Sequence, residues 1–62
     1  MTDTTKLAER IEKAEEWFEY HMLNYERAEE GGSLQSAARN LSDAATWAAI
    51  LATLRAQEAR NG

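Results

Sequence analysis

The sequence predicts an all-α fold, an antiparallel two-helix hairpin that assembles as a homodimeric four-helix bundle. The 62 residues contain no proline and only three glycines, two of them adjacent at Gly31 and Gly32. On both sides of this pair the chain is rich in Ala, Glu, Leu, Arg and Gln, which lose little on becoming helical, and apolar residues recur at helical spacing. We therefore expect a single domain over 1–62, with a helix at about 4–30, a turn at 31–32 and a helix at about 33–60.

The first predicted helix carries one continuous apolar seam. Steps of four and three residues alternate along it, which is the spacing of a helix that packs along one face; the seam comprises Leu7, Ile11, Ala14, Phe18, His21, Tyr25 and Ala28, and Ala8 and Met22 widen it. Asp3 or Thr4 suits the N-cap, and Gly31 suits the left-handed residue that ends a helix.

The second predicted helix starts after Ser33, a suitable N-cap residue. Its expected seam is mostly alanine, comprising Leu34, Ala37, Ala38, Leu41, Ala44, Ala45, Ala48, Ala52 and Ala59. Small side chains let helix axes approach closely, so we expect this helix to be tightly packed. A helix break near Asn40, with Ser42 and Asp43 as a local cap, is the alternative.

A second apolar stripe on this helix, made of Trp47, Ile50, Leu51 and Leu54, predicts self-association. These residues are spaced i, i+3, i+4, i+7 and point away from Leu41, so a single hairpin would leave them uncovered. A homodimer supplies the missing second layer, and the expected oligomer interface comprises Phe18, His21, Tyr25, Leu41, Ala45, Trp47, Ala48, Ile50, Leu51 and Leu54. In architecture alone the chain resembles the Rop family of plasmid copy-number regulators; no motif aligns, and the acidic first helix shows no counterpart of that family's basic, RNA-facing stripe.

Four of the five aromatic residues lie in the window 17–25. Trp, Tyr and Met are enriched at binding hot spots. We expect a partner surface of Trp17, Tyr20 and Leu23, ringed by Glu16, Glu19 and Arg27; the alternative is that Trp17 and Tyr20 only complete the homodimer core.

The composition argues against several classes of partner. The net charge is −4, and the segment from Asp3 to Glu30 holds nine acids and four bases, a balance of −5. Such a segment repels polyanions, so we expect neither direct nucleic-acid binding nor membrane binding. Without cysteine and without an apolar run long enough to span a bilayer, the chain is expected to be cytoplasmic, in the host cell if it is phage-encoded.

Catalytic and metal sites are not predicted. The serines lack a Gly-x-Ser-x-Gly turn, one histidine without an orienting acid cannot complete a triad, and no Glu precedes His21 at the spacing of a helical di-iron site. We expect no enzyme activity, cofactor, metal or small-molecule substrate. His21 is expected to be a neutral seam residue, hydrogen-bonded across the bundle to a residue such as Tyr25 of a neighbour, or a pH-sensitive register residue whose protonation loosens the oligomer.

These features together predict a small protein-binding adaptor or inhibitor that acts as a homodimer, of the kind found among phage and plasmid accessory proteins. One alternative is a structural subunit of a larger helical assembly. Another is an acidic nucleic-acid mimic, in which the glutamates from Glu9 to Glu30 occupy the basic groove of a nucleic-acid-binding protein.

Overall fold

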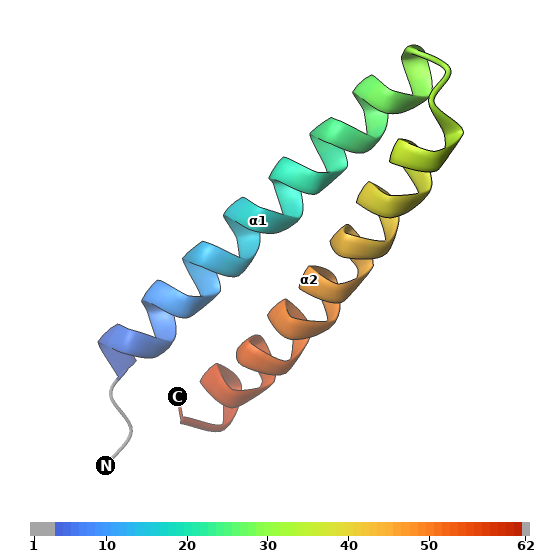
Figure 1. Ribbon diagram of the computed structural model, residues 1–62. Coiled ribbons are helices and arrows are strands. Elements are labelled where there is room, and N and C mark those ends of the chain that lie inside the picture. The colour runs from blue at the N-terminus through green and yellow to red at the C-terminus, as the bar shows by residue number, and fades with distance from the viewer. Residues whose placement is uncertain (1–3, 62) are drawn as a thin grey trace.

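The computed structural model describes residues 4–61 as two long helices, α1 (Thr4–Glu30) and α2 (Leu34–Asn61). They run antiparallel and lie side by side along their whole length, so that the start of α1 and the end of α2 meet at one end of the hairpin (Figure 1). The Cα atoms span 48 × 14 × 12 Å, the dimensions of a single layer of two helices. The predicted all-α hairpin is confirmed, and α2 continues through Asn40 without a break.

A Schellman motif closes α1. The Gly32 N–H donates to the carbonyl of Glu29 at 3.2 Å, and the Ser33 N–H donates to that of Ala28 at 2.9 Å. Gly32 has φ of 78° and is the left-handed residue; the expectation that Gly31 takes this role is wrong, because Gly31 still donates a helical hydrogen bond to Arg27 at 3.0 Å. The Ser33 carbonyl accepts the first α2 bond, from Ala37. The side chains of Asp3 and Thr4, the expected caps of α1, lie outside the described part.

The seam of α1 is as predicted. Its first three positions are buried, with Leu7 6%, Ile11 7% and Ala14 1% exposed. The positions nearer the turn, Phe18, His21, Tyr25 and Ala28, are half-buried, and so is Met22. Ala8 is exposed and does not widen the seam.

The seam of α2 differs from the prediction. The residues that face α1 follow steps of three and four, namely Ala37, Asn40, Ala44, Trp47, Leu51 and Leu54, all buried or half-buried. Most of the expected alanine seam is on the surface: Leu34 is 80% exposed, Leu41 is 46% exposed, and Ala38, Ala45, Ala48, Ala52 and Ala59 are exposed too, whereas its members Ala37 and Ala44 are buried as expected. Asn40 and the bulky Trp47 make the true seam less uniformly apolar than the alanine stripe, which is why periodicity alone selected the wrong face.

Three residues of the second α2 stripe, which we expected to lack a partner within the hairpin, pack inside it, whereas its fourth residue, Ile50, stays 38% exposed. Leu51 and Leu54, 9% and 4% exposed, form the core with Leu7, Ile11 and Ala14, and Trp47 packs against it. This core lies at the end of the hairpin away from the turn, where α1 begins and α2 ends. Towards the turn only the small Ala37 and Ala44 are buried, so the hairpin is thinly packed there.

Candidate binding surface

Because the hairpin is one layer thick, it has two broad sides flanking the seam. We call them the aromatic flank, which contains Trp17, Tyr20, Trp47 and Ile50, and the alanine flank, which contains Leu34, Ala38, Leu41, Ala45, Ala48 and Ala52. On a helix with 3.6 residues per turn, Ile50 lies about 180° from Leu41 around α2, so the two flanks face opposite ways.

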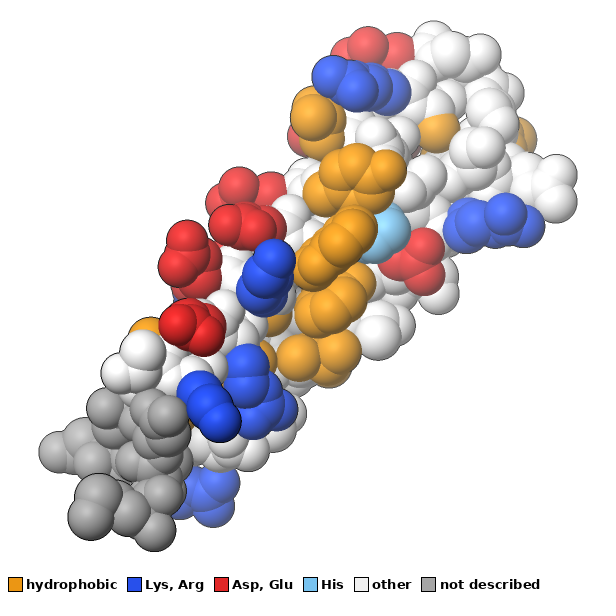
Figure 2. Space-filling model, turned by 60° about the vertical axis from the view of Figure 1, so that its left-hand side comes forward, with side chains coloured by type: hydrophobic (Ala, Val, Ile, Leu, Met, Phe, Trp, Pro, Cys, Tyr) orange, Lys and Arg blue, Asp and Glu red, His pale blue; other side chains and the backbone are white. Residues whose placement is uncertain are grey.

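An aromatic cluster on the first flank bridges the two helices. The rings of Trp17 and Trp47 stack with centroids 6.2 Å apart and planes 16° apart, and Tyr20 meets Trp17 edge-on at 5.5 Å. Trp17 remains 43% exposed, Tyr20 53% and Ile50 38%. Figure 2 shows the resulting column of apolar side chains along this side of the molecule. Large apolar side chains gathered in this way are typical of a binding surface.

Shallow hollows border the column. The first is a groove between the helices lined by Glu9, Arg10, Lys13, Trp47, Ile50 and Leu54. A second is lined by Arg10, Ala49, Ile50, Thr53, Leu54 and Gln57. A third is formed by Glu16, Trp17 and Tyr20. The flank is thus open and lacks a deep cavity among the described residues.

The basic residues of α1 share one strip with its exposed aromatics. Steps of four and three connect Lys6, Arg10, Lys13, Trp17, Tyr20, Asn24 and Arg27, a strip that holds every base of α1 and none of its eight glutamates. On α2, Arg39 and Arg60 share a strip with Ile50, as does Asp43. Net charge alone does not reveal this strip, because it does not show how charges are divided between the sides of a helix.

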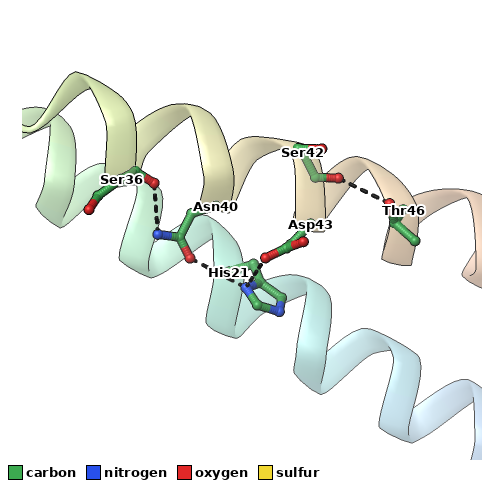
Figure 3. A network of polar contacts seen from close by, with 6 residues as sticks. All are labelled: His21, Ser36, Asn40, Ser42, Asp43 and Thr46. Carbon is green, nitrogen blue, oxygen red and sulfur yellow. Dashed lines mark hydrogen bonds and ion pairs between the residues drawn. The ribbon is translucent and has the colours of Figure 1, made fainter.

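A polar network joins α1 and α2 at His21 (Figure 3). His21 Nδ1 is 3.3 Å from Asn40 Oδ1 and 3.8 Å from Asp43 Oδ2, while Asn40 Nδ2 donates to the Ser36 carbonyl at 3.0 Å. The His21 ring also stacks against Trp17 at 6.0 Å. His21 thus has a carboxylate neighbour that the sequence argument did not find.

Tyr25 is the other polar seam residue. Its hydroxyl donates to Glu29 Oε2 at 2.7 Å within α1, and this hydrogen bond, with the adjacent negative charge, raises the Tyr25 pKa above its ordinary value of 10.0. The hydroxyl that was expected to reach a neighbouring chain therefore has an acceptor in its own helix.

The structure brings together only part of the predicted partner surface. Glu16, Trp17 and Tyr20 line one hollow, and Leu23, 46% exposed, follows Tyr20 along α1. Glu19 and Arg27 are exposed on α1 as well, but Glu19 lies outside the basic strip. Trp47 and Ile50, which α2 contributes to this surface, belong to the predicted oligomer interface instead. The three-and-four spacing from Ala37 to Leu54 places Trp47 at the seam, and Ile50, three residues later, lies at its edge.

The predicted oligomer interface is divided between four places. Leu51 and Leu54 are in the hairpin core, Ile50 and Trp47 are on the aromatic flank, and the alanine flank holds Leu41, Ala45 and Ala48. Phe18, His21 and Tyr25 are half-buried along the seam of α1.

No known protein family, curated protein or solved structure matches the chain. In the part of the chain that the structure describes, neither helix combines the length and apolar character needed to cross a membrane. No group of three or more His, Cys, Asp or Glu side chains in residues 4–61 is placed to hold a metal ion.

Proposed function

We propose that this protein is a non-enzymatic binding protein, an adaptor or inhibitor, that works as a homodimeric four-helix bundle. The observation that carries the proposal is the uncovered apolar surface on two opposite sides of a one-layer hairpin. Leu34 and Leu41 are exposed on one side, and Trp17, Tyr20 and Ile50 are exposed on the other. A helical domain needs a second layer to bury such surface, and a second copy of the chain supplies it.

The alanine flank suits the contact between copies. Its small side chains let a second pair of helices approach closely, and the half-buried Phe18 and Met22 of α1 extend the apolar surface beside it. The aromatic flank suits this contact less, because covering it with a second copy would bury the charged side chains of Arg10 and Lys13 from both chains. This assignment leaves the aromatic flank of each hairpin facing outward.

The outward aromatic flank is then the surface that binds another protein. Trp17 and Tyr20 offer large side chains with few rotatable bonds, and the groove beside Trp47 and Ile50 receives apolar side chains from a partner. Such a surface acts by occupying or connecting protein surfaces and needs no catalytic group.

A structural subunit is the second candidate function. Uncovered apolar side chains on both flanks favour it. Copies that met through both sides would form an open assembly that grows by adding further copies.

Light scattering behind a sizing column, with helicity recorded over a hundredfold range of concentration, tests the proposal. A helical dimer of constant mass supports the adaptor or inhibitor. Masses that grow with concentration favour the structural subunit, and a helical monomer throughout contradicts the homodimer.

A further inference from the structure

We propose that the aromatic flank binds an acidic amphipathic helix of another protein, with its apolar side chains in the groove between α1 and α2 and its carboxylates against Arg10 and Lys13. This inference rests on the proposed function and adds the chemical class of the partner.

The shape of the groove argues for a helix. It runs between two helices that lie side by side over about 40 Å, and its apolar wall is formed by Trp47, Ile50 and Leu54. A third helix laid into such a groove packs its side chains between those of the first two, the arrangement by which amphipathic helices are commonly recognised. Ile50, 38% exposed on its own, becomes covered in that arrangement.

The charges at the groove argue for an acidic partner. Arg10 and Lys13 line it opposite the apolar wall, and Glu9 is the acid among the lining residues. Among residues 4–61, Arg55 pairs with Glu15, whereas Arg10 and Lys13 have no carboxylate partner in the described hairpin. Carboxylates flanking the apolar stripe of a docked helix would provide those partners and would fix its position.

The geometry of the aromatics argues against a nucleic acid as the partner. Proteins that bind single strands present open ring faces on which bases stack. The Trp17 ring is already stacked against Trp47 and His21, at 6.2 and 6.0 Å, and Tyr20 packs edge-on to it. Glu9 and Glu16 also line the hollows of this flank, where they would face a chain of phosphates.

Two synthetic helical peptides serve as probes. Both have leucine at every third and fourth position, and the flanking positions are glutamate in one and lysine in the other. Binding is followed by intrinsic fluorescence, because the two tryptophans of the protein, Trp17 and Trp47, both lie on the aromatic flank. We expect the glutamate peptide to bind about tenfold more tightly than the lysine peptide at low salt, and this preference to shrink as salt is added.

Charge reversal locates the contact. The double variant Arg10→Glu with Lys13→Glu should weaken binding of the glutamate peptide about tenfold and reverse the preference between the two peptides. Arg55→Glu is the control, since it reverses a base that pairs with Glu15 and lies outside the groove. If the double variant loses helicity, Arg10→Gln with Lys13→Gln replaces it and should abolish the preference. Ile50→Glu should prevent binding of the glutamate peptide.

Several results would overturn the inference. One is equal binding of both peptides by the wild type, and another is a preference that Arg10 and Lys13 substitutions leave unchanged. Tighter binding of a synthetic RNA hairpin than of the glutamate peptide, lost in the same double variant, would assign the flank to nucleic acid. A dimer that does not discriminate between the peptides contradicts this inference alone, whereas a monomer that prefers the glutamate peptide contradicts only the homodimer.

Discussion

The imidazole of His21 and the amide of Asn40 face each other across the hairpin, with Nδ1 and Oδ1 3.3 Å apart. The contact joins the middle of α1 to α2 and supports the register in which Ala37, Ala44, Leu51 and Leu54 face α1. Both side chains are half-buried, and a rotation of α2 about its axis would break the hydrogen bond between them, while the Asn40 bond to the Ser36 carbonyl within α2 would remain.

This contact predicts the tautomer of His21. The Asn40 side chain is oriented by its own hydrogen bond, in which Nδ2 donates to the Ser36 carbonyl at 3.0 Å, so its oxygen is turned to the ring. An acceptor at that place requires the neutral ring to carry its proton on Nδ1. Long-range nitrogen–proton NMR correlations of the imidazole should show the Nδ1–H form, and Asn40→Leu should weaken that preference. A ring with its proton on Nε2 contradicts the described contact.

The corrected seam predicts different outcomes for two leucines on α2. Leu51 is 9% exposed in the core and Leu41 is 46% exposed on the alanine flank. Leu51→Ala should reduce the free energy of unfolding by about 2–5 kcal/mol, because it leaves a cavity between the helices. Leu41→Ala should mainly raise the dissociation constant of the dimer and change the stability of the hairpin core little. Urea unfolding at several protein concentrations separates the two effects; the reverse pattern would support the alanine seam first expected.

The turn offers a matched pair of glycines. Gly32 has φ of 78°, so Gly32→Ala forces a Cβ into the left-handed region and should destabilise the hairpin by about 1–2 kcal/mol. At Gly31 an added Cβ would lie 3.4 Å from the Arg27 carbonyl oxygen, an ordinary contact, and the backbone is not left-handed. Gly31→Ala should therefore reduce the free energy of unfolding much less than Gly32→Ala. Thermal unfolding of both variants followed by circular dichroism provides the comparison, and equal losses would be inconsistent with the Schellman motif.

Tyr25 predicts a pH dependence in the alkaline range. Its hydrogen bond to Glu29 raises the pKa of the folded-state phenol, so the bond stabilises the hairpin below the ordinary tyrosine pKa of 10.0 and is lost as pH rises through the higher folded-state pKa. A Tyr20→Phe background leaves Tyr25 as the only phenol, and its ionisation is followed by ultraviolet absorbance. Adding Glu29→Gln should move the Tyr25 pKa down towards its ordinary value; an unchanged titration means that Glu29 is not the cause.

Helix periodicity was sufficient for the hairpin and for the α1 seam, because Leu7, Ile11 and Ala14 begin a single uninterrupted stripe. It was insufficient for α2, because both the alanine-rich stripe and the stripe with Trp47 and Leu51 have the spacing of a packed helix face. The stripe with more alanine looked more uniform, yet a seam can contain Asn40 when His21 satisfies it and can contain Trp47 when its ring stacks on Trp17. These partners come from the other helix, so the pattern of α2 alone could not reveal them. For the same reason the sequence predicted the α1 residues of the aromatic flank, Trp17 and Tyr20, as a partner surface but not its α2 residues, Trp47 and Ile50.

The measurement that tests the account most directly compares the mass in solution of Leu41→Glu and Ile50→Glu at equal concentration by light scattering. Both variants place one carboxylate on an exposed site of α2, on opposite flanks. We predict that Ile50→Glu remains a helical dimer, as we expect of the wild type, while Leu41→Glu becomes a monomer. A dimeric Leu41→Glu together with a monomeric Ile50→Glu would contradict the account, because the copies would then meet through the aromatic flank.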